Sequence, residues 1–258
     1  MDIFQASVLG AVEGFTEFLP ISSTGHMMIA AHAMSISQSD AVKSFEIIIQ
    51  SGAIAAVIGR YWRQLLDVER LKVIMVAFMP TAIIGFTLYP LVKSVLLGNL
   101  NIVGWALIIG GVVMVLFELA QQKKPTQVVN PDMKVRISYP QAIMVGLAQS
   151  AALIPGVSRS AATIIGGQMV GISRSDIVDF SFLLAVPTLL AATGLDLLKN
   201  YHDVLATDPL QLGVGFLVAF AMASLSISFL LAFIKRFSFI PFGVYRIVVG
   251  ALLLYMLS

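Results

Sequence analysis

Two short polar segments of this sequence carry residue types that suit phosphoryl-transfer chemistry. The first segment places Glu13 and Glu17 at i,i+4 spacing, so both carboxylates lie on one face of a helix. Two carboxylates this close disfavour joint ionisation, so either one holds a proton or a cation bridges them. Mg²⁺ and Ca²⁺ prefer such oxygen ligands. The pair is therefore a candidate metal site, although two solvated carboxylates on an interfacial helix would give the same pattern.

A run of hydroxyl groups follows the two glutamates. Pro20 ends the first helical stretch, and Ser22, Ser23 and Thr24 are suited to cap the next helix. A helix N-terminus that carries hydroxyls and free N–H groups binds anions. His26 lies three residues beyond Ser23, so the two side chains can face one point, and an imidazole acts as base, acid or nucleophile near neutral pH. Taken alone, His26 is explained equally well as a packing residue.

The second polar segment contributes a single cation. Arg159 is the only Lys or Arg in 137–173, and it lies in the sequence Pro-Gly-Val-Ser-Arg-Ser. A guanidinium offers a planar fork of donors that fits a phosphate, and Ser158, Ser160 and Thr163 add hydroxyls around it. The alternative is a structural arginine that snorkels or forms a salt bridge. Together the two segments favour phosphoryl or pyrophosphoryl chemistry on an anionic substrate.

The composition places these segments in a membrane protein. Of the 258 residues, 58% are hydrophobic and 12% are charged, and the mean hydropathy is +0.93. Soluble domains carry about 25% charged residues, so an ordinary soluble enzyme is excluded. The net charge of +2 is too small for a nucleic-acid-binding protein, and the absence of cysteine excludes disulfide and thiolate chemistry. The first residues lack a basic region, so no cleavable signal peptide is predicted.

Six apolar stretches are long enough to cross a bilayer, which takes about 20 residues. They are 41–61, 73–92, 94–117, 175–198, 209–234 and 237–257. Two further apolar regions, 2–34 and 138–171, are each interrupted by one of the polar segments. Their halves are too short to cross alone, and irregular backbone at membrane depth must be buried in protein. The sequence therefore predicts an all-α polytopic membrane fold of six transmembrane helices and two re-entrant helix pairs.

The two interrupted regions are related by an offset of 136 residues. The superposed residues are Glu13 with Gln149, Ser22 with Ser158, and Ser23 with Arg159. Each half then contains a break, a short helix and three spans, and because three is odd the halves must run in opposite directions. We therefore predict an inverted-topology repeat in one membrane domain, with repeat one at 1–120, a cytoplasmic loop at 121–138 and repeat two at 139–258. In such proteins, ligand sites lie where the broken helices meet near the midplane.

The interrupted regions also carry the GxxxG spacing, which permits close helix packing. The glycines are Gly10 with Gly14, and Gly167 with Gly171.

Basic residues gather at one predicted end of the spans. They are Arg60, Arg63, Arg70, Lys72, Lys123, Lys124, Lys134, Arg136, Arg174, Lys235 and Arg236. Cytoplasmic loops are enriched in Lys and Arg, so this end is predicted to face the cytoplasm, with both termini outside. The first break then enters from outside and the second from inside.

The two motifs resemble those of a known family. The stretches Glu13-Gly-Phe-Thr-Glu17-Phe-Leu-Pro-Ile-Ser-Ser-Thr-Gly-His26 and Pro155-Gly-Val-Ser-Arg-Ser-Ala-Ala-Thr163 are similar to motifs of the bacterial undecaprenyl-pyrophosphate phosphatase family, which is linked to bacitracin resistance. The similarity covers essentially the whole chain, with Ala161-Ala162 in place of the more usual Gly-Ser. It implies a hydrolase of the bacterial inner membrane that converts undecaprenyl pyrophosphate to undecaprenyl phosphate. This activity recycles the lipid carrier for peptidoglycan and cell wall synthesis, and so supports cell shape and antibiotic resistance.

The resemblance also implies roles for residues. Glu17, Ser23, His26 and Arg159 fall on the family's functional positions with Glu13 beside them, and a divalent cation, Mg²⁺ or Ca²⁺, is implied near Glu13 and Glu17. The residues predicted to bind phosphate are Ser22, Thr24, Ser158, Ser160 and Thr163.

Three mechanisms stay open at this point. Ser23 attacks the terminal phosphorus with Glu17 or His26 as the base, or His26 attacks it, or water is activated directly. The alternative function is a transporter or flippase of polyprenyl phosphate, because broken helices in inverted repeats are typical of transporters. The expected partners are the polyprenyl pyrophosphate substrate and membrane lipid, with no nucleic acid. The oligomeric state is open, a homodimer included, and the active site is expected to open to the outer face.

Overall fold

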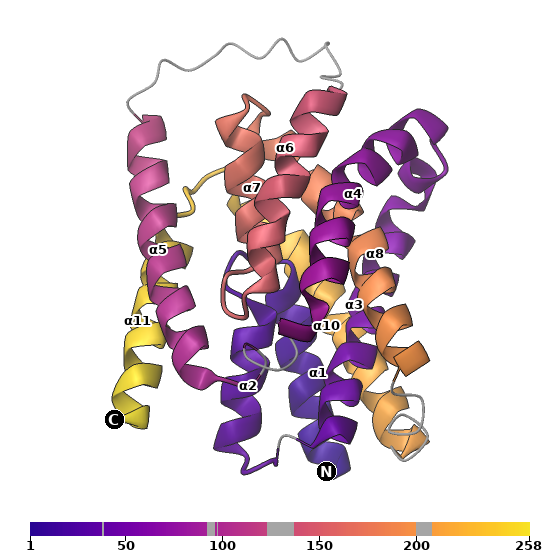
Figure 1. The fold of residues 1–258 in the computed structure, drawn as a ribbon, viewed down its shortest axis with the longest axis vertical. Helices are drawn as coiled ribbons and strands as arrows, with labels where there is room; N and C mark the ends of the chain where they lie inside the picture. Colours follow the sequence, from indigo (N-terminus) through magenta and orange to yellow (C-terminus); the bar gives the residue numbers. More distant parts are fainter. Residues whose placement is uncertain (38, 92–95, 97, 123–136, 200–207) are drawn as a thin grey trace.

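A computed structural model describes residues 1–37, 39–91, 96, 98–122, 137–199 and 208–258. Over these residues the chain forms ten α-helices and a 3-10 helix at Ala151–Leu153, and it contains no strand. The helices are α1 Ile3–Glu17, α2 Ser23–Ala33, α3 Asp40–Leu65, α4 Val68–Leu91, α5 Leu100–Gln122, α6 Tyr139–Ser150, α7 Arg159–Met169, α8 Arg174–Lys199, α10 Pro209–Phe233 and α11 Ile240–Leu257. Figure 1 shows a single bundle in which most helices follow the long axis. The predicted all-α fold is confirmed for this part of the chain.

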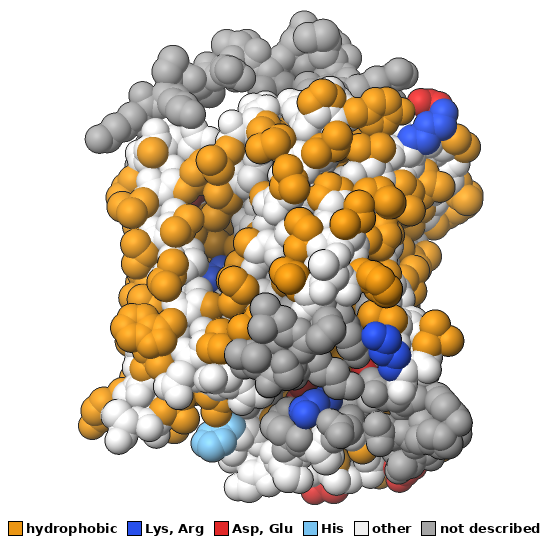
Figure 2. All heavy atoms as spheres, in the orientation of Figure 1, with side chains coloured by type: hydrophobic (Ala, Val, Ile, Leu, Met, Phe, Trp, Pro, Cys, Tyr) orange, Lys and Arg blue, Asp and Glu red, His pale blue; other side chains and the backbone are white. Residues whose placement is uncertain are grey.

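Six of the described helices are long and apolar enough to cross a membrane. They are Ala41–Leu65, Val68–Leu88, Leu100–Gln121, Arg174–Lys199, Pro209–Phe233 and Ile240–Leu257. These helices correspond to the six predicted stretches, so the chain is a multi-pass membrane protein. Figure 2 shows hydrophobic side chains covering the long side of the bundle, as expected where lipid replaces water.

Two of the six helices begin five or more residues from their predicted starts: α4 at Val68 instead of 73, and α5 at Leu100 instead of 94. Gly98, just before α5, takes a φ of 90°, which lies outside the helical region. Asn99 then caps α5, accepting hydrogen bonds from two backbone N–H groups of the first turn at 3.1 and 3.3 Å. Helix α4 begins earlier, at Val68, so that Lys72 lies in its first turns and pairs with an exposed carboxylate.

The four short helices form two antiparallel pairs. Gln5 near the start of α1 donates a hydrogen bond from Nε2 to the carbonyl of Met34 at the end of α2, at 3.5 Å. Gln141 near the start of α6 does the same to the carbonyl of Val170 at the end of α7, at 3.0 Å. Each pair therefore returns to the end of the bundle from which it starts. The first pair occupies the end that carries both termini, and the second pair occupies the opposite end (Figure 1).

The two pairs share local structure at equivalent positions. The first helix of each pair begins with a capping box. The side chain of the N-cap residue accepts a hydrogen bond from the backbone N–H of a glutamine three residues later, and the glutamine side chain accepts one from the backbone N–H of the N-cap residue. Each second helix has a serine N-cap with a positive φ, 76° at Ser22 and 75° at Ser158. Positive φ is uncommon outside glycine. Each serine hydroxyl accepts a hydrogen bond from the N–H three residues later, at 3.4 and 3.2 Å.

Close packing of α1 depends on glycine. A Cβ on Gly10 or Gly14 would lie 2.5 or 2.2 Å from a backbone carbonyl oxygen of α10, so the predicted GxxxG contact is present. The prediction for the second pair was wrong. Helix α7 ends at Met169, and Gly171 lies in the following turn with a φ of 84°. Gly171 therefore serves the turn, while only Gly167 packs tightly, against a side chain of α8.

The charge distribution follows the prediction where the structure describes it. The helix ends that carry Arg60, Arg63, Arg70, Lys72, Arg174, Lys235 and Arg236 lie away from the two termini (Figure 1). The predicted basic residues Lys123, Lys124, Lys134 and Arg136, and most of the predicted loop 121–138, lie outside the described residues.

Candidate active site

The two breaks meet inside the bundle, and side chains from both line one cavity of about 180 Å³. Six of the ten predicted site residues line it: Glu17, Ser22, Ser23, Thr24, Ser158 and Arg159. A hydrogen bond of 2.8 Å from Ser160 Oγ to the carbonyl of Leu19 joins the breaks directly. The structure therefore brings together two segments that are far apart in the sequence.

Glu17 forms hydrogen bonds with residues of both breaks. Its Oε2 accepts a hydrogen bond from Ser23 Oγ, and its Oε1 pairs with Arg159 Nη2 at 3.0 Å. Only 6% of the Glu17 side chain and 9% of the Arg159 side chain are exposed, and a buried pair of this kind needs further hydrogen bonds. Arg159 obtains them from Ser181, donating from Nη1 to the carbonyl at 2.7 Å and to Oγ at 3.2 Å. Ser23, Glu17 and Arg159 thus form one hydrogen-bonded chain.

Local helix geometry sets the direction of this chain. Ser23 is the first residue of α2, and Arg159 is the first residue of α7. Both helices begin at the cavity, behind the serine N-caps Ser22 and Ser158. A helix N-terminus carries free N–H groups and a partial positive charge. Two N-termini that converge beside a guanidinium have the charge and the donors that suit a phosphate or diphosphate.

The remaining predicted hydroxyls support the breaks from behind. Ser160 and Thr163 are fully buried and do not line the cavity. Ser160 donates to the carbonyl of Leu19 in the first break. The Thr163 hydroxyl lies 3.0 Å from two backbone carbonyls of its own helix and 2.7 Å from Ser181 Oγ, with which it forms a hydrogen bond. Their geometry therefore indicates support of Arg159 rather than contact with a ligand. Ser181 was missed as a site residue, because one serine on a long apolar helix carries no local signal.

The imidazole of His26 bonds groups other than the Ser23 hydroxyl. Its Nδ1 lies 2.7 Å from the carbonyl of Ser22, which only accepts, so this nitrogen carries a proton. Its Nε2 lies 2.9 Å from the hydroxyl of Tyr245, and the two rings stack with centroids 5.5 Å apart. Both ring nitrogens are therefore engaged, and His26 does not line the cavity. Glu17, which accepts the Ser23 hydrogen bond, is better placed than His26 to remove the Ser23 proton.

Glu13 lies fully buried one helical turn before Glu17. Neither of its carboxylate oxygens has a hydrogen-bond partner among the described residues. An unpaired buried carboxylate is costly, so these oxygens suit a proton or a cation. In the same part of the chain, no cluster of three or more Asp, Glu, His or Cys surrounds a single point. A cation here would therefore take further oxygen ligands from hydroxyls, backbone or substrate.

The opposite wall of the cavity is polar but neutral. Gln149, the counterpart of Glu13 in the second half, donates to the hydroxyls of Thr81 and Thr188 at 2.9 and 3.2 Å. Gln149, Thr81 and Thr188 all line the cavity. The carboxylates of the site therefore come from the first half alone, and the guanidinium at the cavity comes from the second.

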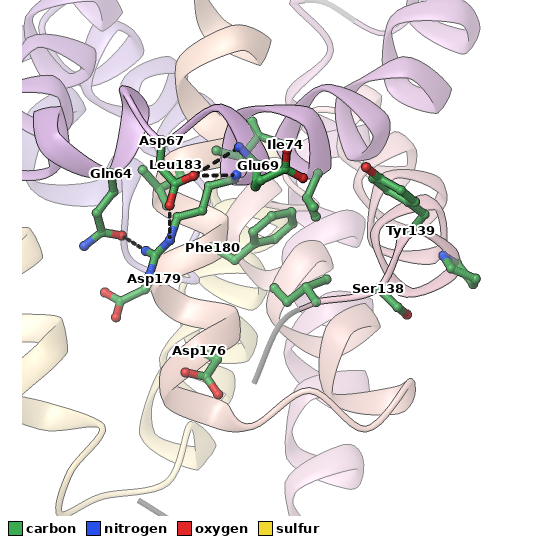
Figure 3. Close-up of a pocket in the computed structure, with 14 residues that line it drawn as sticks. Gln64, Asp67, Glu69, Ile74, Ser138, Tyr139, Asp176, Asp179, Phe180 and Leu183 are labelled. Atoms are coloured by element: carbon green, nitrogen blue, oxygen red, sulfur yellow. Dashed lines mark hydrogen bonds and ion pairs between the residues drawn. The ribbon is translucent and has the colours of Figure 1, made fainter. Parts of the chain in front are cut away.

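A larger cavity of about 760 Å³ lies between the ends of α3, α4, α6 and α8 (Figure 3). Three aspartates line it, and the carboxylate of each accepts a hydrogen bond. Asp67 accepts from the backbone N–H of Glu69, Asp176 from the hydroxyl of Ser173, and Asp179 from the hydroxyl of Tyr61 at 2.5 Å. None of the predicted site residues lines this cavity. Its groups are satisfied by the protein itself, so it offers no comparable set of reactive side chains.

These features define a multi-pass membrane protein with a buried hydroxyl, carboxylate and guanidinium site suited to phosphate groups. The family described as bacitracin resistance protein BacA matches residues 6–252. The chain belongs to this family.

Proteins from several bacteria are similar over the whole length. A protein of Persephonella marina named undecaprenyl-diphosphatase is 44% identical over 255 residues, which cover 98% of each chain. One of Wolinella succinogenes with the same name is 44% identical over 259 residues, covering 100% of this chain and 99% of the relative. A third, of Aquifex aeolicus, is 45% identical over 251 residues, covering 97% and 96%.

Proposed function

We propose that the protein is an undecaprenyl-diphosphatase. It hydrolyses the terminal phosphate of undecaprenyl pyrophosphate to give undecaprenyl phosphate, which recycles the carrier lipid for peptidoglycan synthesis and gives bacitracin resistance. The observation that carries the proposal is the hydrogen-bonded chain Ser23–Glu17–Arg159 across the two breaks. Transport alone needs no activated hydroxyl. The substrate follows from the name shared by the full-length relatives.

In the mechanism that the geometry supports best, Ser23 Oγ attacks the terminal phosphorus while its proton passes to Glu17 Oε2. The bond from the terminal phosphorus to the bridging oxygen breaks, and undecaprenyl phosphate leaves. The leaving undecaprenyl phosphate takes the proton from Glu17, which is then a carboxylate again. Water attacks the phosphoserine and gives its proton to Glu17, Ser23 Oγ takes that proton back as its bond to phosphorus breaks, and phosphate leaves. Arg159 and the N-termini of α2 and α7 stabilise the developing charge. Attack by His26 and direct attack by water are the alternatives, and trapping the phospho-enzyme and mapping its modified residue separates the three.

The assay that tests this function is phosphate release by purified protein in detergent, where no second leaflet exists. Undecaprenyl pyrophosphate with Mg²⁺ or Ca²⁺ is expected to yield one phosphate per undecaprenyl phosphate formed. Absence of release, together with lipid movement across vesicles, would support a transporter or flippase of polyprenyl phosphate instead.

A divalent cation fits beside Glu13 and Glu17, because both Glu13 oxygens are buried and unpartnered. When bound, such an ion supplies positive charge that neutralises phosphate oxygens. Glu13 would hold such an ion, and Glu17 stays hydrogen-bonded to Ser23.

Replacing Glu13 by glutamine is therefore expected to raise the Mg²⁺ concentration for half-maximal activity by about tenfold or more, the effect expected from loss of one carboxylate ligand. The melting temperature gives a second readout. Mg²⁺ is expected to raise it for the wild type and not for E13Q, because only an ion that binds the folded state stabilises it. If Glu13 is instead a protonated carboxyl, the isosteric glutamine leaves both responses unchanged.

We further propose that α1–α2 and α6–α7 are the two re-entrant pairs of an inverted repeat, in a protein of the bacterial inner membrane. The shared capping boxes and the positive φ of Ser22 and Ser158 support the repeat. The positive-inside rule supports an orientation with both termini at the outer face, and we expect the site to open to that face.

This topology is testable because the chain has no cysteine. In intact spheroplasts, an impermeant thiol reagent is expected to label single cysteines at Asp2 and Ser258 but not one at Gln64. Labelling at Gln64 in sealed cells contradicts the proposed orientation.

A further inference from the structure

Arg246 is a charged residue in the middle of the otherwise uncharged helix α11. Its side chain is fully buried. Charged groups at membrane depth are costly, so they are rare and are generally functional. It lies 87 residues beyond Arg159 in the sequence, and no predicted chemistry at the cavity accounts for it.

The guanidinium of Arg246 binds backbone carbonyls of both breaks. Nη1 donates to the carbonyl of Pro20 at 3.3 Å, and Nη2 donates to that of Gly156 at 2.9 Å. Nη2 also donates to the carbonyl of Ala106 on α5, at 3.2 Å. Within the part of the chain that the structure describes, no ion pair to a carboxylate accompanies these bonds, and Nε has no partner. The charge is therefore directed to the two break loops.

The two carbonyls occupy equivalent places in the two halves. Pro20 precedes Ser23 by three residues, and Gly156 precedes Arg159 by three residues. The guanidinium of Arg246 thus binds the same position in each break. That position lies three residues before Ser23 in the first break and three residues before Arg159 in the second. This placement points to control of the distance between Ser23 and Arg159.

Helix α5 leaves space for this contact. A Cβ on Gly110 would lie 2.0 Å from Arg246 Nη2, which no side chain permits. Other bonds across the breaks run from Ser160 to Leu19 and from Arg159 to Glu17. The second of these involves groups that must also meet the substrate, so it is not available as a fixed support during the reaction.

We infer that Arg246 is a positioning residue, which holds the two breaks in register so that Ser23 and Arg159 face the same terminal phosphate. This inference rests on the proposed phosphatase function. A displacement of reacting groups by about 1 Å lowers rates by about 10²-fold. Lysine keeps the charge but has no planar fork that reaches several carbonyls.

The kinetic test compares R246M, R246K and the control R174M in phosphate release. Arg174, whose side chain is 32% exposed, forms an ion pair with the buried Glu118, with Nη2 2.7 Å from Oε2, and neither residue lines the cavity. We expect kcat to fall about 10²-fold in R246M and at least about tenfold in R246K, with KM changed less than about threefold. R174M, per folded molecule, is expected to stay within about threefold of the wild type. Full activity in R246K would show that charge, not the fork, matters, and would overturn the inference.

A second readout needs no substrate. Thr24 and Ile154 both line the cavity, one from each break, and in a chain without cysteine the double variant T24C/I154C provides one reactive pair. A short bis-maleimide is expected to cross-link this pair efficiently in T24C/I154C, whether Arg174 is native or replaced as R174M. When R246M is added to T24C/I154C, cross-linking is expected to be poor. Should R246M fail to fold, G110A displaces the guanidinium without removing it and is expected to lower kcat and cross-linking alike.

The two readouts separate the two hypotheses. If the wild type releases no phosphate, the proposed function fails, while the cross-linking comparison still decides the role of Arg246. Equal cross-linking and kcat within threefold of the wild type in both R246M and G110A would show that Arg246 does not position the breaks.

Discussion

Alanine at Ser23 is expected to lower kcat for phosphate release by on the order of 10³-fold, because it removes the group that forms the covalent intermediate. Glu17→Gln is expected to have a similar effect, since the amide accepts no proton from Ser23. The two residues act as one unit through their hydrogen bond, so S23A/E17Q should be no slower than S23A alone. Single-turnover phosphate release and phospho-enzyme trapping measure these effects.

His26→Gln provides the comparison for this prediction. Its ring nitrogens face Ser22 and Tyr245 and not Ser23, so H26Q should retain kcat within about tenfold, the smaller effect expected when no reacting proton is lost. A phosphohistidine in the wild type, or near-full activity in S23A, contradicts Ser23 as the nucleophile. Equal losses in H26Q and E17Q would contradict Glu17 as its base.

Arg159→Lys is expected to lower kcat/KM by about 10²-fold or more. Lysine keeps one positive charge but loses the fork that reaches Glu17 and Ser181 together, and one lost donor to a transition-state oxyanion costs about 10²–10³ in rate. Phosphate release at several substrate concentrations separates the change in kcat from that in KM.

Loss of stability must be separated from loss of chemistry at this position. Arg159→Met leaves Glu17 buried without its partner, which destabilises by about 3–5 kcal/mol. Adding E17Q removes the unpaired charge, so R159M/E17Q is expected to melt above R159M and yet stay inactive. Because E17Q by itself removes the base, the catalytic role is measured in R159M: near-wild-type kcat per folded molecule of R159M would show that Arg159 only supports the fold.

The fold was predictable where hydropathy decides it. Within a bilayer each spanning segment must satisfy its own backbone hydrogen bonds, so long apolar stretches, three of them uncharged and three with a few charged residues, located six helices with errors only at their ends. The start of α5 depended on the φ of Gly98 and the cap at Asn99, which hydropathy does not report.

Three residues that line the cavity, Glu17, Ser23 and Arg159, were also recognisable from the sequence as candidates, because polar groups in apolar surroundings are costly unless they are used. Their partners were not recognisable. Arg246 reaches Pro20 across 226 residues, and Tyr245 reaches His26 across 219. Such pairs form only when helices from distant parts of the chain pack side by side. The sequence by itself determined which segments are apolar enough to span the membrane and which polar side chains interrupt them, because both depend on local polarity. Which carbonyl or hydroxyl each side chain meets was decided by the tertiary structure alone, because a hydrogen bond depends on ångström distances between packed helices.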